Sequence, residues 1–326
     1  MHSNKYNKIL IIQTAFIGDV ILASALIEKL NQYFPEAKID FLLRKGNETL
    51  LQNNPKINKV LIWDKKTSKY KNLFKILKQI RKEKYDLLIN LQRFASSGLL
   101  TCFSNAKEKR GFDKNPFSFC FDKKSKHKIN NGKHETERNQ ELISDITDNK
   151  ANKPKLYPST ADFEFVSKYK NEKYITMAPA SVWFTKQLPK EKWIELVNAN
   201  KEYKVFLLGA ASDYELCNEI IKKTAHNNIE NLSGKLSFLQ SAALMNDAAM
   251  NYVNDSAPLH IASAMNANVT AFFCSTIPEF GFGPLSDNSK ILQVQEKLDC
   301  RPCGLHGFKS CPEKHFDCGF KINLKE

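Results

Sequence analysis

The sequence has no apolar run that approaches the ~20 residues of a membrane-spanning helix, and its N-terminal stretch, MHSNKYNKI, lacks the apolar core of a secretion signal. Cysteine is sparse in most of the chain: four of the eight cysteines are scattered before residue 300, and the other four lie within residues 300–318. This distribution is unlike the disulfide framework of a small secreted protein. With 42% hydrophobic and 26% charged residues, the composition predicts an ordinary soluble globular protein of the cytoplasm.

Two ligand-binding motifs are missing as well. No Asp-x-Asp pair occurs anywhere in the chain, so we expect that neither a metal nor a cofactor is required. No strand-like segment is followed by G-x-G-x-x-G, and the only G-x-G, Gly281-Phe282-Gly283, lies far from a clear strand-to-helix turn. This absence argues against a nicotinamide-dependent oxidoreductase, in which the glycines bring the backbone close to a pyrophosphate.

Positive charge, in contrast, is abundant and unevenly distributed. The net charge is +14, and residues 1–150 carry +13 of it, with 29 Lys and Arg against 16 Asp and Glu. A lysine-rich helix face such as that of residues 65–84 can simply be solvated. We favour an acidic partner for this half: a phosphorylated substrate, an anionic membrane surface or nucleic acid. Nucleic acid is the least favoured, because we find no binding motif and expect no basic helix interleaved with exposed aromatics.

The order of apolar segments predicts an α/β protein of two doubly wound, Rossmann-like domains, residues 1–155 and 156–326. A chain of 326 residues exceeds what one hydrophobic core usually serves. Strand-like segments alternate with helical patterns, the first of which lie at about 20–34 and 68–83. The segments are KILIIQ, KIDFLLR, KVLIW and YDLLINL in the first half, and KYITMAP, KVFLLGA, AMNYVND and NVTAFFCS in the second. We expect the active site in the cleft between the domains.

One carboxylate, Asp19, lies where the first strand-like segment turns into a helical pattern. Ligands of such sheets bind at the carboxyl ends of the strands, so Asp19 is a candidate catalytic group. Asp is also a favoured helix cap, because its oxygens accept hydrogen bonds from free backbone amides. The residues alone leave both interpretations open.

Three loops of the second half carry polar residues directly after a strand. A lysine with hydroxyl groups suits a pyrophosphate, a carboxylate at a helix start suits ribose hydroxyls, and helix-start amides bind phosphate. The groups are Ser181, Thr185 and Lys186; Asp213 and Glu215; and Asp255 and Ser256. Each is also explained as a surface charge or a helix cap, so the argument depends on their recurrence at successive strand ends.

Several blocks of the sequence resemble glycosyltransferase family 9, the ADP-heptose:lipopolysaccharide heptosyltransferases. They are ILIIQTAFIGDVILASALIEKL, SVWFTKQLPKEKW and NDSAPLHIASAMNANVTAFF, and the end, CRPCGLHGFKSCPEKHFDC, is similar to that of the heptosyltransferase II branch. The resemblance implies a GT-B architecture, with an N-terminal acceptor domain facing a C-terminal nucleotide-sugar domain across a cleft. It implies a donor such as ADP-heptose, an acidic lipopolysaccharide-precursor acceptor, and a peripheral position on the inner face of the cytoplasmic membrane.

The resemblance also implies residue roles. Asp19 would be the general base, Lys186 would bind the donor phosphates, and Glu215 or Asp213 would bind the ribose. Ser181, Thr185, Asp255, Ser256 and His260 would complete the donor site. Gly18, Arg44 and Arg93 are expected on the acceptor side.

The chain departs from the family pattern at three positions, where Ala180, Leu188 and Ala257 replace the usual Gly, Trp and Gly. Ala257 matters most, because glycine there would let the backbone approach a phosphate closely.

The end of the chain, with Cys300, Cys303, Cys311 and Cys318, is compatible with structural zinc, with disulfides or with reduced thiols. Beside the sugar transferase, two alternatives stay open: a two-domain oxidoreductase and a non-catalytic nucleotide-sugar-binding homologue.

Overall fold

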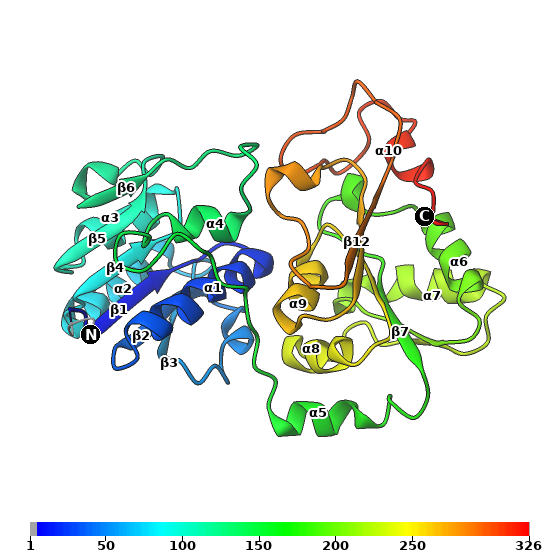
Figure 1. The fold of residues 1–326 in the computed structure, drawn as a ribbon, viewed down its shortest axis with the longest axis horizontal. Coiled ribbons are helices and arrows are strands. Elements are labelled where there is room, and N and C mark those ends of the chain that lie inside the picture. Colours follow the sequence, from blue (N-terminus) through cyan, green and yellow to red (C-terminus); the bar gives the residue numbers. More distant parts are fainter. Residues whose placement is uncertain (1–4, 326) are drawn as a thin grey trace. The chain divides into compact units, whose positions relative to one another are not determined.

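The computed structural model describes residues 5–325. Residues 1–4, part of the stretch in which we expect no secretion signal, lie outside the described residues. The chain divides into two compact units, Met1–Ile129 with Lys133–Tyr157 and Asn130–Gly132 with Pro158–Glu326. Each unit is a parallel six-stranded sheet with helices on both faces (Figure 1), so the predicted α/β class is confirmed.

The sheet of the first unit has the strand order β3-β2-β1-β4-β5-β6. Its strands are β1 (Lys8–Ile12), β2 (Lys38–Arg44), β3 (Ile57–Trp63), β4 (Leu87–Asn90), β5 (Glu108–Phe112) and β6 (Lys123–Ser125). The helices are α1 (Ile17–Tyr33), α2 (Lys69–Glu83), α3 (Ala95–Cys102) and α4 (Glu135–Gln140), with short 3₁₀ turns at Glu48–Leu50 and Ser118–Cys120. Because β1 pairs with both β2 and β4, the order of the strands reverses beside β1.

The second unit repeats this plan with the strand order β12-β11-β10-β7-β8-β9. Its strands are β7 (Tyr174–Ala178), β8 (Lys204–Leu207), β9 (Ile229–Asn231), β10 (Asn251–Asn254), β11 (Val269–Phe273) and β12 (Ser289–Gln293). The helices are α5 (Thr160–Ser167), α6 (Lys190–Ala199), α7 (Tyr214–Lys223), α8 (Phe238–Asn246), α9 (Ala257–Met265) and α10 (Asp317–Phe320). Short 3₁₀ turns occur at Phe184–Lys186, Ala211–Asp213 and Pro278–Phe280, and the strand order reverses between β7 and β10.

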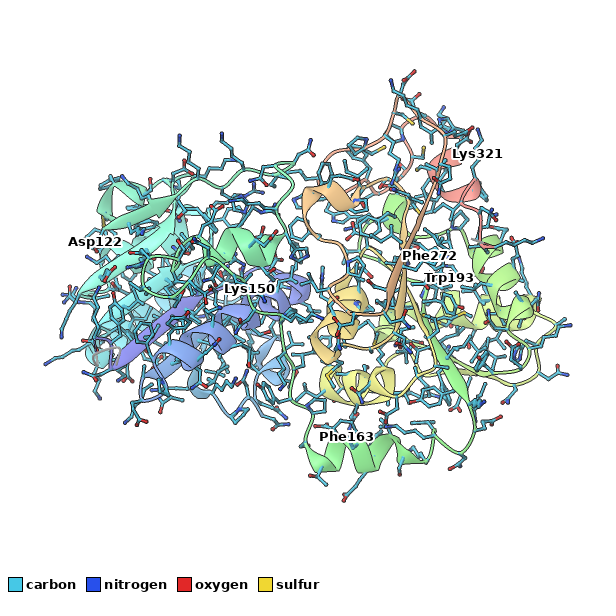
Figure 2. All side chains as sticks on the ribbon, viewed as in Figure 1. Asp122, Lys150, Phe163, Trp193, Phe272 and Lys321 are labelled. Carbon is cyan, nitrogen blue, oxygen red and sulfur yellow. A yellow bond between two sulfur atoms is a disulfide. The ribbon has the colours of Figure 1, made fainter. Side chains whose placement is uncertain are left out.

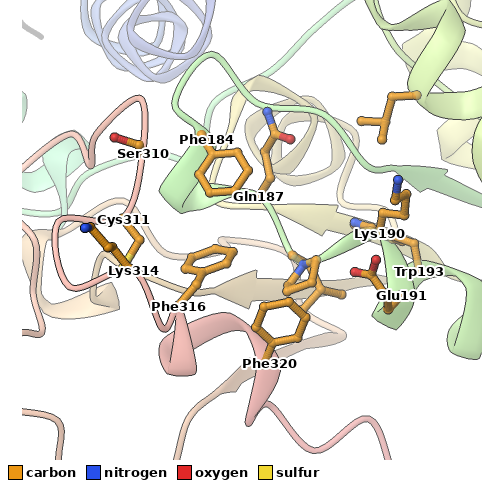
Figure 3. Close-up of a pocket in the computed structure, with 13 residues that line it drawn as sticks. Phe184, Gln187, Lys190, Glu191, Trp193, Ser310, Cys311, Lys314, Phe316 and Phe320 are labelled. Atoms are coloured by element: carbon orange, nitrogen blue, oxygen red, sulfur yellow. The ribbon is translucent and has the colours of Figure 1, made fainter.

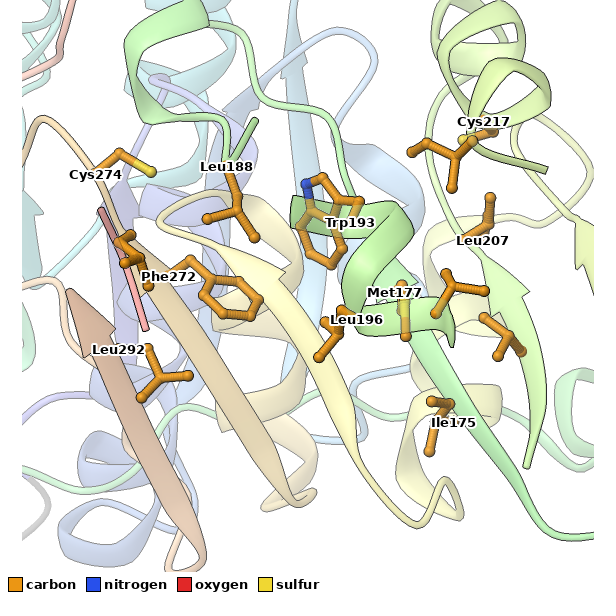
Figure 4. Close-up of a cluster of buried hydrophobic side chains, with 14 of the residues drawn as sticks. Ile175, Met177, Leu188, Trp193, Leu196, Leu207, Cys217, Phe272, Cys274 and Leu292 are labelled. Carbon is orange, nitrogen blue, oxygen red and sulfur yellow. The ribbon is translucent and has the colours of Figure 1, made fainter. Parts of the chain in front are cut away.

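Both sheets are buried between helices, which explains why their central strands are continuously apolar. In the second unit, α6 and α7 cover one face of the sheet, and the indole of Trp193 meets the ring of Phe272 edge-on at 5.3 Å between centroids (Figures 2 and 4). The sulfur of Met177 and the side chain of Leu207 complete this core. Within residues 5–325, no helix is both long enough and apolar enough to span a bilayer.

The first helix differs from the prediction in one respect that concerns the site. α1 begins at Ile17, with Phe16 as its N-cap, so Gly18 and Asp19 belong to the first helical turn and not to the loop before it. The backbone amide of Phe16 donates a hydrogen bond to Asp19 Oδ2 at 3.1 Å. This bond lets the helix start early, because it satisfies an amide that otherwise has no partner.

Candidate functional site

Ligand sites of open α/β sheets lie at the carboxyl ends of the strands, where the strand order reverses. In the first unit this position lies between β1 and β4, and in the second between β7 and β10. Asp19 follows β1, Arg93 follows β4, Lys186 follows β7 and Asp255 follows β10. The candidate residues with the most specific chemistry therefore flank the two reversal points.

Asp19 combines a capping contact with an unusual acidity. Its side chain is half-buried, and the bond from the Phe16 amide engages one carboxylate oxygen. The pKa of Asp19 is raised to about 6, mainly by burial and also by the negative charge of Glu135 at the start of α4. Backbone amides and the Arg44 guanidinium act in the opposite direction. A carboxylate with this pKa is mostly ionised at neutral pH and accepts a proton more readily than an ordinary Asp.

Three cations lie at the same edge of the first sheet. Arg44 is the last residue of β2, with its guanidinium 5.2 Å from the ring centre of Phe16, and the exposed Arg93 follows β4. Lys65 follows β3, and its ammonium donates hydrogen bonds to the hydroxyl of Thr14 at 2.7 Å and to the carbonyl of Thr14 at 3.1 Å. Within the described part of the chain, none of the three cations forms an ion pair with a carboxylate.

Lys65 was not among the residues predicted for a site, although it follows the strand-like segment KVLIW by only two positions. Burial lowers the pKa of Lys65 to about 8, and the charges of Arg44 and Lys69 contribute. A half-buried lysine that faces other cations gains most from an anionic ligand, which would restore its ordinary pKa. This edge of the first unit is therefore suited to an acidic group.

In the second unit, Lys186 and Asp255 form an ion pair. The ammonium of Lys186 lies 2.7 Å from Asp255 Oδ2, and the hydroxyl of Thr276 donates a hydrogen bond to the same oxygen at 2.6 Å. Asp255 is only 5% exposed. The pair fixes the lysine beside the start of α9, where Ser256 is the N-cap and Ala257 the first helical residue. Lysine and helix-start amides together provide positive potential for a phosphate.

Asn254, which sequence reasoning missed, holds the loop that carries Lys186. Its amide nitrogen donates to the carbonyl of Pro179 at 2.9 Å, and its amide oxygen accepts from the backbone N–H of Leu188 at 2.8 Å. One buried side chain thus ties both ends of the loop to the end of β10. Its position at the end of the strand-like segment AMNYVND was the only signal in the sequence.

The two ribose candidates have different environments. Asp213 Oδ2 accepts a hydrogen bond from the Ala210 amide at 2.8 Å, so this carboxylate caps the short turn before α7. Glu215 is the exposed second residue of α7, and within residues 5–325 it has no hydrogen-bond or ion-pair partner. Of the pair, Glu215 has the free carboxylate. His260, the fourth residue of α9, is buried. The backbone carbonyl of Ser181 accepts a hydrogen bond from the side-chain amide of Gln187 at 2.6 Å.

The cysteine-rich segment packs against the loops of this site. The guanidinium of Arg301 donates to the carbonyl oxygens of Phe273, Cys274 and Thr276 at 3.1, 2.6 and 2.7 Å. Phe308 donates its backbone N–H to the hydroxyl of Thr185 at 2.7 Å and accepts from the Thr185 amide at 3.1 Å. The segment is therefore a brace for the residues directly beside Lys186 and Asp255.

The cysteines of this segment, Cys300, Cys303, Cys311 and Cys318, are free thiols. Among residues 5–325, no group of three or more His, Cys, Asp or Glu residues is arranged to hold a metal ion. The one disulfide of the described residues joins Cys102 to Cys120 in the first unit. Of the three alternatives for the end of the chain, the structure agrees with reduced thiols.

A pocket of about 590 Å³ lies between the start of α6 and the segment that contains Cys311 (Figure 3). Phe184, Trp193, Phe316 and Phe320 provide most of its apolar wall. Neither Lys186 nor Asp255 lines it. The pocket is therefore separate from the polar site at the reversal point of the sheet.

Comparison with known proteins shows the family of the chain. The sequence profile described as glycosyltransferase family 9 (heptosyltransferase) matches residues 73–307. The chain is 28% identical to lipopolysaccharide heptosyltransferase 3 of Escherichia coli over 289 residues, which cover 84% of this chain and 85% of the relative.

Two solved structures share the fold. One is the E. coli ADP-heptose lipopolysaccharide heptosyltransferase II, with a TM-score of 0.78, 21% identity and coverage of 91% of this chain and 95% of that chain. The other is a glycosyl transferase family 9 protein from Veillonella parvula, with a TM-score of 0.80, 21% identity and coverage of 90% and 87%. The expected family resemblance and the GT-B class are confirmed.

Proposed function

Because the chain belongs to glycosyltransferase family 9 and is a glycosyltransferase, we propose that it transfers a heptose or a related sugar from an ADP-sugar to the acidic inner core of lipopolysaccharide. The names of its relatives support this donor and acceptor. Family membership removes the oxidoreductase alternative. The presence of Asp19, Lys186 and Asp255 supports an active enzyme over a non-catalytic homologue, despite Ala257.

In the proposed reaction, Asp19 takes the proton from an acceptor hydroxyl as its oxygen attacks the anomeric carbon of the donor sugar. A new carbon–oxygen bond forms while the bond to the diphosphate breaks, and the electron pair leaves with the nucleotide. The pKa of Asp19, about 6, suits this task, because the group is ionised at neutral pH and still holds a proton well.

The second unit would hold the nucleotide-sugar. Negative charge develops on the diphosphate as the sugar departs, and the ammonium of Lys186 and the amides at the start of α9 would stabilise it. These groups supply the charge that a metal supplies in other transferases, so the proposal needs no metal. Glu215 is the better of the two ribose candidates, because Asp213 is engaged in a cap.

The first unit would hold the acceptor, with Gly18 in the turn beside Asp19. Arg44, Lys65 and Arg93 provide three cations without carboxylate partners at the edge where Asp19 lies, which suits the phosphates and carboxylates of a lipopolysaccharide precursor. Since such an acceptor is embedded in lipid, we place the protein at the inner face of the cytoplasmic membrane. No nucleic-acid partner is proposed.

The observation that carries the proposal is the position of Asp19 and the Lys186–Asp255 pair at the reversal points of two doubly wound sheets. The test is transfer by the full chain with ADP-, GDP- and UDP-sugars and an acidic lipopolysaccharide precursor, followed by mass spectrometry of the product. We expect product with the ADP-sugar, and turnover by Asp19→Asn lowered about a hundredfold or more, with ADP binding retained.

Asp162 provides a matched control. It is also the third residue of a helix, and its Oδ2 accepts from the backbone N–H of the N-cap, Ser159, at 2.8 Å. Asp162→Asn should therefore reproduce any effect of this substitution on a cap, without a loss of turnover. Near-normal turnover in Asp19→Asn would refute the assignment of the base.

A further inference from the structure

Helix α2 of the first unit exposes two aromatic rings on its outer side. Leu73, Ile76 and Ile80 of this helix are buried against the sheet. Tyr70 and Phe74, one turn apart, are 71% and 61% exposed. Single exposed apolar residues are normal, but two neighbouring exposed rings on an otherwise well-packed helix require an explanation.

Cations surround the two rings. Six exposed basic residues belong to α2: Lys69, Lys71, Lys75, Lys78, Arg81 and Lys82. Within residues 5–325, none of them forms an ion pair with a carboxylate. The only acidic residue of α2, Glu83, is half-buried and engaged by the ammonium groups of Lys8 and Lys59. The outer side of α2 is therefore purely basic and aromatic; we call it the aromatic-basic face.

This finding corrects one expectation from the sequence, which was that no basic helix is interleaved with exposed aromatics. A helix face of solvated lysines in residues 65–84 would explain the cations, but it would not explain the exposed rings of Tyr70 and Phe74. Aromatic rings that lie among lysines are typical of helices in the interface of a bilayer, where rings enter the headgroup region and cations bind anionic lipids. Single-stranded nucleic acid also combines phosphates with stacking surfaces, so it is the alternative to be tested.

We infer that the aromatic-basic face of α2 is a docking surface for an anionic phospholipid bilayer, with Tyr70 and Phe74 inserted among the headgroups. The inference deepens the proposed function, since a lipid-embedded acceptor requires the protein to work at a membrane. It depends on charge complementarity and on the exposure of the two rings. Binding to vesicles can be measured whether or not the sugar transfer is correct.

The test is flotation of the full chain with vesicles of phosphatidylcholine, with and without phosphatidylglycerol. We expect binding only when phosphatidylglycerol is present, and loss of binding as salt shortens the Debye length from ~10 Å at 0.1 M to ~3 Å at 1 M. Replacing Lys71, Lys75 and Lys78 by Gln should weaken binding on the order of a hundredfold, because each lysine near an anionic surface contributes about fivefold. Tyr70→Ala with Phe74→Ala should weaken it about tenfold or more while the salt dependence remains.

Phe165 of α5 gives a matched control for the rings. Its ring is 42% exposed, and the ammonium of Lys168 lies 4.7 Å from the ring centre. Phe165 is therefore also an exposed aromatic residue beside a lysine, but it lies outside the proposed surface. Phe165→Ala should leave vesicle binding unchanged. Equal loss in this variant, or wild-type binding by the Tyr70/Phe74 variant, would overturn the inference.

Two further measurements separate docking from other roles. An excess of a single-stranded oligonucleotide should not displace the protein from vesicles; tight oligonucleotide binding that the α2 variants abolish, without vesicle binding by the wild type, would overturn the inference. Sugar transfer to a deacylated, water-soluble acceptor should be equal in wild type and α2 variants. Loss of that transfer would assign α2 to the acceptor site, whereas absence of any transfer by the wild type would affect only the proposed function.

Discussion

The ion pair between Lys186 and Asp255 allows a prediction with a defined magnitude. Lys186→Met removes the ammonium that lies 2.7 Å from Asp255 Oδ2 and leaves a carboxylate that is 5% exposed with the Thr276 hydroxyl as its remaining side-chain partner. Removing one partner of a buried pair costs about 3 to 5 kcal/mol of unfolding free energy. We expect the lower end of this range, because Thr276 still donates to the carboxylate.

Donor binding should suffer for two reasons in the same variant. Loss of a charge-assisted hydrogen bond reduces the free energy of ADP binding by about 1.5 to 3 kcal/mol, which raises the dissociation constant roughly tenfold to a hundredfold. The unpaired Asp255 carboxylate then also repels the diphosphate, so the total loss should exceed that range. Calorimetry with ADP measures the affinity, and urea denaturation measures the free energy of unfolding.

The double variant Lys186→Met/Asp255→Asn separates structure from function. It leaves no uncompensated buried charge, so most of the unfolding free energy should return, while the charge-assisted bond to the phosphates stays lost. Lys190→Met is the control, because Lys190 forms an exposed ion pair with Glu219 in the same unit, at 2.7 Å. That variant should change both quantities by less than about 1 kcal/mol. Wild-type ADP affinity in the double variant would show that the pair is purely structural.

Two further predictions concern the acidity of the base and the brace. Asp19 must be ionised to accept a proton, so kcat/KM should fall about tenfold per pH unit below pH 6, the pKa of this carboxyl. Glu135→Gln removes a charge that raises the pKa of Asp19, so in this variant the decrease in kcat/KM should occur at lower pH. A pH–rate profile of both proteins measures the difference. Arg301→Lys keeps the charge but loses the fork that reaches three carbonyl oxygens, including that of Thr276; ADP affinity by calorimetry should fall several-fold, and an unchanged affinity would argue against the brace.

The fold was largely predictable because its central strands are buried on both faces. KILIIQ and KIDFLLR became β1 and β2 within one residue, since continuous apolar runs identify such strands. Four strands of residues 5–325 were missed, and all are short and mostly polar: β6 and β9 have three residues each, and β5 and β12 have five each. Pairing with a neighbouring strand creates them, and no local pattern reports that pairing.

The candidate site was predictable to the extent that it lies at strand ends. The sequence places Lys186 and Asp255 after two strands, but their pairing depends on β7 and β10 being neighbours, although β8 and β9 lie between them in the chain. The contact of Thr185 with Phe308 spans 123 positions and was likewise invisible. Sequence patterns indicate which side chains reach the edge of a sheet, and only the topology decides which of them meet.

Asp19 shows that the two interpretations of a first-turn carboxylate are compatible. A cap requires an oxygen that accepts a hydrogen bond from an amide, and the Phe16 contact uses one carboxylate oxygen of two. A base requires a carboxylate with a raised pKa, and burial with the nearby Glu135 raises it against the amides and Arg44. The cap lowers the pKa, so capping alone would make the group a poorer base. The pKa nevertheless rises to about 6, which is compatible with the proposed role as a base. Asp162, whose Oδ2 also accepts from its N-cap amide and in addition from the Ser159 hydroxyl, is the comparison that tests this argument.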